Sequence, residues 1–343
     1  MADQTSDRGP ESAPSPEDNH RLRTRAYRHG VLVSEGFPLD DVSDHLRDPA
    51  VVVWADFCAP TPTDLDQIAD ELQLHDLAIE DALKARQRPK LDRYDSHLFL
   101  SAYQVTLDVT SGRLDTCAVA AFITTQAVVT VHDSPRFSIE DVVRNWDADA
   151  DLAAHGVGFL LHGLLDHVVD SHFWAVNALD TEIEGLEDLL FEDGSHDKEV
   201  HRRSYELRKS LVLLRRVVLP MREVVNALMR RDLHIVDAEL TPYYQDVYDH
   251  VLRASEWMES LRDLVATILE TNLTIQGNRM NNIMKKVTSW AAIVAVPTAV
   301  TGFYGQNVPY PGFGDATGFW ASTALITVLS GALFVAFRHQ DWL

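Results

Sequence analysis

VTSWAAIVAVPTAVTGFYGQN, residues 287–307, is the stretch that decides the fold of this chain. Between Lys286 and Arg338 the only charged residue is Asp315, which leaves two uncharged runs of 28 and 22 residues. About 20 helical residues cross the apolar core of a bilayer, and a charge near its centre costs roughly 2.5–3.5 kcal/mol. Each run therefore predicts a helix that crosses a membrane.

The predicted spans cover about residues 287–305 and 317–337, and a short loop rich in glycine and proline connects them. The basic residues that flank this hairpin all lie at its open end: Arg279, Lys285, Lys286 and Arg338. The connecting loop contains no basic residue. The positive-inside rule then predicts a multi-pass protein of the plasma (inner) membrane, with both termini in the cytosol. Because residues 1–20 contain no apolar segment, we expect no signal peptide.

The overall charge narrows the classes of function. Thirty basic residues stand against 52 acidic ones, which gives a net charge of −22. Such a surface repels nucleic acid and attracts cations, although solubility alone would also explain it. Cys58 and Cys117 are far apart and fit buried thiols better than a disulfide or a zinc site. No Walker A, HExxH, GxSxG or GxGxxG motif occurs, so we expect no enzyme.

The residues before the predicted spans divide into segments that differ in composition and hydrophobic pattern. Residues 1–20 have the composition of a disordered tail, and residues 21–150 predict a cytosolic α/β domain. Its runs of strand length are residues 31–33, 51–57, 97–107, 114–123 and 127–131, and two helices are expected at 63–72 and 76–85. Five to seven strands are expected, and their order stays open.

Residues 151–284 predict a cytosolic helical domain. Apolar residues at helical spacing give an antiparallel pair, 157–190 and 199–229, in which Pro220 either kinks its helix or is accommodated. A stalk helix at about 242–304 then runs into the first span, and its 60 or so residues reach on the order of 90 Å. Residues 285–343 form the two-helix transmembrane domain.

A seven-residue repeat approaches and enters the first span. Its positions are separated by three and four residues: Asn281, Met284, Thr288, Ala291, Ala295 and Thr298. Such a repeat favours several parallel helices packed around an axis. Small residues also permit close packing of membrane helices, and the sequence supports both interpretations equally. Since one hairpin cannot enclose a polar path, any pore requires an oligomer.

The segment Tyr304-Gly305-Gln306-Asn307 at the end of the first span resembles the signature Y/F-G-M-N of the CorA family of divalent-cation channels. Three further segments resemble the family in the same order: 79–81 with 87–90, 211–223 and 244–250. The resemblance covers nearly the whole chain. It implies an α+β membrane protein that forms a funnel-shaped homopentamer, with the first span lining the pore and the second outside it.

Under this resemblance, Tyr304, Gly305, Gln306 and Asn307 form the selectivity filter, with five Asn307 side chains ringing the outer mouth. Neutral amide oxygens suit Mg²⁺, which sheds its water reluctantly, whereas a carboxylate ring would bind it too tightly for conduction. Gly305 is expected to let the backbone turn. Without the neighbouring signature and spans, Asn307 would be interpreted as a helix C-cap.

The pore lining implied by the resemblance comprises Asn281, Met284, Val287, Ala291, Ala295 and Thr298. Thr298 would supply a hydroxyl ring that binds hydrated cations, and Asn281 would mark the cytosolic end. The apolar positions between them would close by dewetting. Because Ala295 is small, we place the gate at Val287 and Met284.

Regulation follows from the same resemblance. Asp81 and Asp246 match positions that bind a divalent cation between neighbouring cytosolic domains, so intracellular Mg²⁺ would close the channel. Glu80 and Asp170 are candidates for a second site. Taken singly, each of these acids would be interpreted as a solvated surface residue.

Three functions remain open. The first is a channel for Mg²⁺ uptake that also admits Co²⁺ and Ni²⁺, with the other protomers, membrane lipids and divalent cations as its partners. The second is a Zn²⁺ transporter, proton-coupled or not, because Gln306 replaces the methionine of the signature. The loop holds one acid, Asp315, so we expect weaker electrostatic concentration of cations at the mouth. The third is a membrane-tethered sensor or scaffold that transports nothing.

Overall fold

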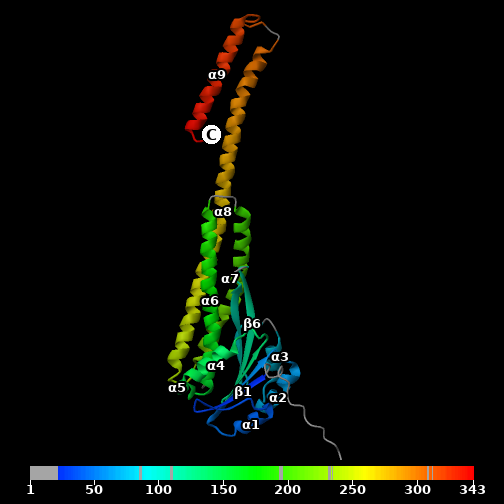
Figure 1. Cartoon of the computed structure of the whole chain (residues 1–343), viewed down its shortest axis with the longest axis vertical. Coiled ribbons are helices and arrows are strands. Elements are labelled where there is room, and N and C mark those ends of the chain that lie inside the picture. The colour runs from blue at the N-terminus through cyan, green and yellow to red at the C-terminus, as the bar shows by residue number, and fades with distance from the viewer. Residues whose placement is uncertain are drawn as a thin grey trace, which may run out of the picture. The chain divides into compact units, whose positions relative to one another are not determined.

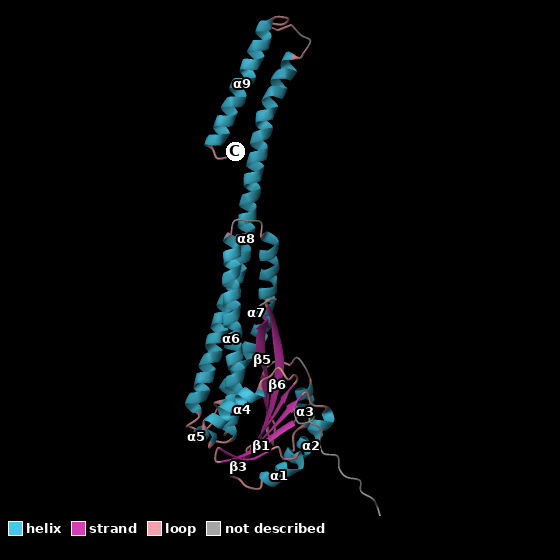
Figure 2. Ribbon diagram, viewed as in Figure 1, coloured by secondary structure: helices cyan, strands magenta, loops and turns pink. Residues whose placement is uncertain are grey.

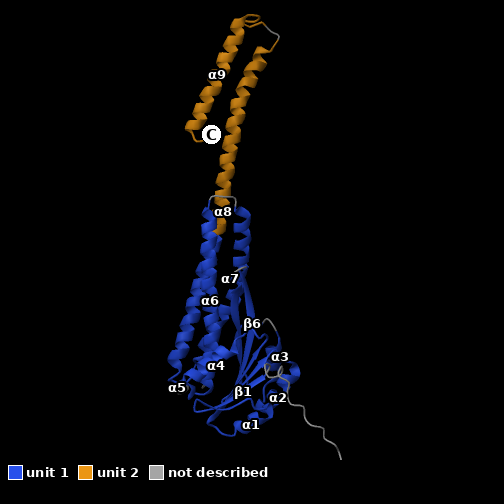
Figure 3. Ribbon diagram, in the orientation of Figure 1, with its two compact units in different colours: residues 1–266 blue, residues 267–343 orange. Residues whose placement is uncertain are grey.

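The computed structural model describes residues 22–84, 87–108, 111–192, 196–230, 233, 235–306, 309–310 and 312–343. The chain divides into two compact units, residues 1–266 and residues 267–343 (Figure 3). One helix, α8 (Thr241–Tyr304), contributes residues to both units. The sheet and most of the helices belong to the first unit.

The first unit contains a mixed sheet of seven described strands in the order β2-β1-β3-β7-β6-β5-β4 (Figure 2). The strands are β1 (Leu22–Arg28), β2 (Val31–Glu35), β3 (Val51–Cys58), β4 (Lys90–Arg93), β5 (Leu98–Asp108), β6 (Arg113–Ile123) and β7 (Ala127–His132). Among these described strands, β3 and β7 are the one pair that runs parallel. The five strands expected from apolar runs are confirmed. β1 and β4 escaped prediction because charged residues interrupt their apolar pattern, as Arg25 does in β1, where it pairs with Glu35 and Asp147.

Side-chain alternation along β3 places this sheet between two helical layers. Val53 and Phe57 point into a core that also contains Leu65 of α2 (Pro62–Leu72) and Ala78 of α3 (Asp76–Leu83). On the opposite face, the ring of Trp54 meets Trp146 of α4 (Ile139–Ala148) edge-on, with centroids 5.0 Å apart. This period-2 pattern buries both faces of the strand. The short elements η2 (Leu39–Asp41), α1 (Val42–His45) and α5 (Ala150–Ala153) complete the unit's connections.

Two long helices, α6 (Val157–Phe191) and α7 (Asp197–Leu228), pack on each other and along the β5–β6 hairpin (Figure 1). They confirm the expected helical pair. Pro220 lies inside α7 and is accommodated there. The sheet and this pair share one compact unit.

His172 fixes α6 to the sheet and makes the first unit sensitive to acid. The side chain is fully buried, its Nε2 lies 2.7 Å from the Tyr103 carbonyl oxygen, and its Nδ1 has no hydrogen-bond partner among the described residues. Burial lowers the pKa of His172 to about 4, and the bond to Tyr103 offsets only part of that effect. The unfolded chain, with a pKa near 6.5, therefore binds more protons below that pH.

We expect the stability of the protein to fall as pH drops from about 6.5 towards 4, with the His172 contribution reaching about 2 kcal/mol at pH 5. His172→Gln, which stays neutral, should lose this contribution, so its Tm should fall less between pH 7 and pH 5. Exposed His201 provides the control, His201→Gln. Thermal unfolding followed by tryptophan fluorescence measures the difference. Equal pH dependence in all three proteins would contradict the prediction.

The second unit consists of the rest of α8 and helix α9 (Ala316–His339), which run antiparallel. Buried or half-buried positions recur along one side of each helix: residues 289, 293, 296 and 300 of α8, and residues 322, 326, 330, 333 and 337 of α9. Spacings of three and four define one helix face, so these two faces form the seam of the hairpin. Both helices are long and apolar enough to cross a membrane, and their apolar windows are almost entirely unburied.

Candidate functional site

The described part of the signature continues the last turn of α8. The Gly305 N–H donates to the Thr301 carbonyl at 2.8 Å, and the Gln306 N–H donates to the Phe303 carbonyl at 3.2 Å. Gly305 is not among the glycines with a left-handed backbone, so a turn at positive φ does not explain it. A Cβ there would lie 3.0 Å from the Thr301 oxygen, a close contact that a shift of a few tenths of an ångström would relieve. Asn307 lies outside the described residues.

Aromatic residues of the loop hold the end of α8. The Tyr310 hydroxyl donates to the Tyr304 carbonyl at 3.1 Å, and their rings meet edge-on with centroids 4.9 Å apart. Phe313 packs edge-on against Tyr310. Gly312 and Gly318 allow this compact loop, since a Cβ on Gly318 would lie 2.6 Å from the Gly312 oxygen. Sequence reasoning missed Tyr310 and Phe313, although repeated aromatics in so short a loop were an available signal.

The repeat positions of α8 all lie on an exposed face away from the seam with α9. These exposed residues are Asn281, Met284, Val287, Thr288, Ala291, Ala295 and Thr298. All seven side chains stay exposed in the protomer, and Trp342 lines a pocket beside Asn281, Met284 and Thr288. Thr298 donates its hydroxyl hydrogen to the Val294 carbonyl at 3.0 Å, so the oxygen keeps lone pairs for a cation or its water. The helix thus presents an uncharged stripe of small, weakly polar or flexible residues, with Asn281 and Thr298 at its ends.

Asp81 at the end of α3 is already neutralised within the protomer. Its carboxylate accepts a bond from Lys90 Nζ at 2.7 Å, and Gln87 donates to its other oxygen. The hydrogen bond from Lys90 holds the pKa of Asp81 below its usual range. Lys90 also pairs with Asp92. A cation that binds Asp81 must therefore compete with Lys90.

Asp170 belongs to a cluster that links α6 to α8. Asp166, Asp170 and His250 each offer a ligand atom, and these atoms lie within 4.8 Å of one another. Asp246 stands one turn before His250, with its carboxylate 3.9 Å from His250 Nε2. Although 52 % of its side chain is exposed, burial and then the Asp166 charge raise the pKa of Asp170. Two carboxylates beside an imidazole form a plausible donor set for a divalent cation.

Sequence reasoning found Asp170 and Asp246 but missed Asp166 and His250. The available signal was spacing, because each missed residue lies four positions from a predicted one and so shares its helix face. Glu80 is not part of this cluster and pairs with Lys84 on α3. Within one protomer, His250 therefore lies near both Asp170 and Asp246. Glu80 and Asp81 lie on a different helix, α3.

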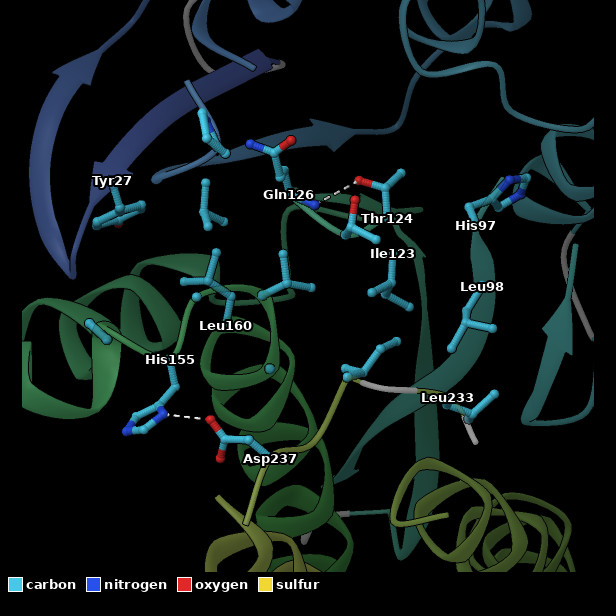
Figure 4. Close-up of a pocket in the computed structure, with 18 of the residues that line it drawn as sticks. Tyr27, His97, Leu98, Ile123, Thr124, Gln126, His155, Leu160, Leu233 and Asp237 are labelled. Carbon is cyan, nitrogen blue, oxygen red and sulfur yellow. Dashed lines mark hydrogen bonds and ion pairs between the residues drawn. The ribbon is translucent and has the colours of Figure 1, made fainter. Parts of the chain in front are cut away.

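The first unit contains two pockets, and they differ in whether a residue predicted to bind metal lines them. A pocket of about 660 Å³, shown in Figure 4, contains none of the predicted site residues. On one side of it His155 Nδ1 lies 2.6 Å from Asp237 Oδ2. A smaller pocket of about 170 Å³ includes Asp81 together with Lys84 and His132.

Known proteins resemble this chain along most of its length. The family model described as CorA-like Mg²⁺ transporter protein matches residues 49–339. The cobalt/magnesium transport protein CorA of Thermotoga maritima is 30% identical over 321 residues, which are 90% of this chain and 88% of that protein. The zinc transport protein ZntB of Yersinia enterocolitica is 22% identical and covers 75% of this chain and 77% of its own. The solved structure of the CorA magnesium transporter from Methanocaldococcus jannaschii matches with a TM-score of 0.76 at 22% identity, covering 93% and 98% of the two chains.

The family match, together with two apolar C-terminal helices after an α/β domain and a long helix, defines a class of membrane transporters. The chain belongs to the CorA family of divalent-cation transporters. The fold class expected from the sequence is thereby confirmed. Membership also supports a transporter rather than an enzyme.

Proposed function

We propose that this chain forms a homopentameric channel that conducts Mg²⁺ into the cytosol across the plasma membrane, with both termini cytosolic. The observation that carries the proposal is the stripe of α8, which is exposed in the protomer and which leads to the Tyr304-Gly305-Gln306 segment. An uncharged helix face of small residues in a membrane has two uses, close packing or a pore. Thr298, which lies within the span, favours the pore, because polar side chains are costly where they only face lipid.

The stripe accounts for conduction and closure. Asn307 carboxamides at the outer mouth would hold Mg²⁺ through its water shell, and the Thr298 hydroxyl ring would receive the hydrated ion next. Val287 and Met284, more than half exposed in the protomer, would close the path by excluding water. Inward flux would follow the membrane potential, at about 2.3 kcal/mol per charge per 100 mV.

Regulation would act through Asp81 and Asp246 of neighbouring protomers. The Lys90–Asp81 ion pair sets a threshold, since Mg²⁺ must displace an ammonium before it can join the two carboxylates. A site that competes with an internal cation binds weakly, as feedback by free cytosolic Mg²⁺ requires. Metal bound between the domains would favour the closed assembly, and metal loss would release it.

The Asp166–Asp170–His250 cluster would take a second divalent cation. Mg²⁺ prefers six oxygen ligands, whereas an imidazole nitrogen suits Co²⁺, Ni²⁺ and Zn²⁺. This cluster would therefore hold Co²⁺ more tightly than Mg²⁺, and it would extend the proposed regulation to transition metals.

His250→Gln is expected to weaken Co²⁺ binding by at least about tenfold, since even loss of an outer-shell partner costs about 10–100-fold. Mg²⁺ binding should change little. The measurement is the rise of Tm on titrating each metal into the purified protein, with His201→Gln as the control. If His250→Gln weakened the binding of both metals equally, or of neither, the His250 imidazole would not be a ligand of this site.

Zinc transport is the second candidate, favoured by Gln306 at the position of the signature methionine. Uptake of Mg²⁺, Co²⁺ and Zn²⁺ into proteoliposomes, with and without a proton gradient, tests the two candidates together. Mg²⁺ uptake that is independent of the proton gradient and suppressed by internal Mg²⁺ supports the channel. Zn²⁺ uptake alone would replace it, and absence of any flux would favour a sensor or scaffold.

A further inference from the structure

Two neighbouring helices of the first unit carry opposite charge. α6 contains seven acidic residues and neither lysine nor arginine: Asp166, Asp170, Asp180, Glu182, Glu184, Glu187 and Asp188. α7 contains four acidic residues and eight basic ones: Lys198, Arg202, Arg203, Arg208, Lys209, Arg215, Arg216 and Arg222. In a chain with a net charge of −22, α7 is therefore a basic surface that attracts acidic partners.

Each helix exposes one face on which large apolar side chains lie among the charges. The α6 face repeats at spacings of three and four residues: Asp170, Trp174, Asn177, Thr181, Glu184 and Asp188. The α7 face is built in the same way: Lys198, Arg202, Tyr205, Arg208, Lys209, Val212 and Arg216. Trp174 is 70 % exposed, Tyr205 63 % and Val212 44 %. Solubility explains exposed charges, but an exposed tryptophan and tyrosine among them indicate a contact surface.

Most charges of these two faces have no partner of opposite sign in the protomer. Arg202 pairs with Glu199 on its own helix, and Asp170 lies 4.0 Å from His250. Among the described residues no ion pair satisfies the rest: Glu184, Asp188, Lys198, Arg208, Lys209 and Arg216. Unpaired charges of opposite sign around apolar centres make the α6 face and the α7 face complementary, as two docking surfaces must be.

The two faces also match in height along the helical pair. Arg203 Nη2 lies 2.9 Å from Glu182 Oε2, so these two residues mark one level of the antiparallel helices. Counting outward from them gives pairs that are level to within one residue: Trp174 with Val212, Asn177 with Arg208, Glu184 with Arg202 and Asp188 with Lys198. A ring of protomers around an axis along these helices keeps every residue at its own level. Acidic residues of one protomer then face basic residues of the next, and apolar residues face apolar ones.

The proposed metal junction turns the same two sides towards each other. Asp170 of the α6 face lies beside His250, which is one turn from Asp246. α7 packs on β4, the strand whose Lys90 pairs with Asp81. A junction between Asp81 and Asp246 of neighbouring protomers therefore brings the α7 side of one towards the α6 side of the other. Head-to-tail contacts of this kind close into rings.

We propose that the α6 face of each protomer docks on the α7 face of its neighbour, so that the helical pairs form a continuous belt around the cytosolic part of the assembly. The inference rests on the proposed homopentamer and adds a surface that joins its subunits. Trp174 packs near Val212 at the centre of this contact. Because Asp170 belongs to the α6 face, a cation bound by Asp170 and His250 lies at the edge of the belt.

Cysteine cross-linking of the full-length protein in membranes tests the contact. Asn177→Cys together with Arg208→Cys, treated with a short bismaleimide, should give a ladder on denaturing gels that reaches five chains, because every subunit links to both neighbours. Each single variant should stay monomeric, which controls for Cys58 and Cys117. Asn177→Cys with Arg222→Cys is the matched control and should give no ladder, since residue 222 lies about 21 Å further along α7.

Charge reversal in the Asn177→Cys, Arg208→Cys protein tests electrostatic recognition. Glu184→Lys with Asp188→Lys should lower the yield of the ladder by about tenfold, because like charges then face Arg202 and Lys198 of the neighbour. Adding Lys198→Glu with Arg202→Glu should restore the ladder, since opposite charges meet again. Restoration excludes misfolding as the cause of the loss.

Several results would overturn the proposal. A link confined to one chain would mean that the two faces meet within the protomer. A dimer without larger species would indicate a two-fold contact instead of a ring. No link in a protein that native mass spectrometry shows to be pentameric would leave both faces to solvent, while the channel proposal stands. A wild type that is not pentameric would overturn the homopentamer itself, on which both proposals depend.

Discussion

Replacing Asn307 with alanine is expected to reduce Mg²⁺ uptake into proteoliposomes to the level of vesicles without protein. Alanine offers no oxygen to the water shell of the ion, so the barrier to entering the mouth rises. Tyr304 and Gly305, which are held by Tyr310 and Thr301, remain in place, and assembly should persist. A Mg²⁺-sensitive dye trapped in the vesicles measures uptake, and native mass spectrometry measures the oligomer.

Two variants control this experiment. Asn307→Asp keeps the size of the side chain but adds five charges to the proposed ring, so Mg²⁺ should bind tightly and leave slowly, and flux should fall. Gln340→Ala removes a carboxamide beyond α9 and should leave uptake unchanged. Wild-type flux in Asn307→Ala would remove the amide ring from the mechanism, whichever residues line the pore.

Asp246→Asn is expected to raise the internal Mg²⁺ concentration that halves the flux by on the order of tenfold, the scale of a typical coupling between sites. The aspartate needs a cation at the proposed interface to offset its negative charge, whereas a neutral amide does not. Stopped-flow uptake into vesicles preloaded with graded Mg²⁺ measures the shift. Glu256→Gln, an exposed acid on the same helix, is the control and should behave as wild type.

Lys90→Gln should shift the same curve in the opposite direction. Removing the ammonium that lies 2.7 Å from Asp81 leaves this carboxylate free for Mg²⁺, so closure should need less metal. The two variants together separate a metal site from a general loss of fold, which could not move the curve both ways. An unchanged curve in both would place the sensor elsewhere and leave the pore assignment untouched.

The membrane hairpin and its exposed stripe could be predicted from sequence because both depend on local periodicity. Lys286 and Arg338 bound the spans, and the cost of charge in a bilayer permits little else. The strand order could not be predicted, since pairing such as that of β3 with β7 joins residues about seventy positions apart. The expected role of Gly305, a backbone turn that orients Asn307, stays a prediction because Asn307 lies outside the described residues.

The candidate metal-binding residues also divide into those that the sequence indicated and those that only the structure revealed. Asp81 and Asp246 follow from family resemblance and remain predictions, whereas Lys90 as the partner of Asp81 emerged only from the fold. His250 joins Asp166 and Asp170 across eighty positions of sequence, and Trp342 reaches Lys285 through the turn at Asp341. By itself the sequence determined that two helices are long and apolar enough to cross a membrane and which face of the first one stays exposed in the protomer, because burial cost and helical period act locally. The tertiary structure alone decided which charges meet, because those distances depend on how remote segments pack.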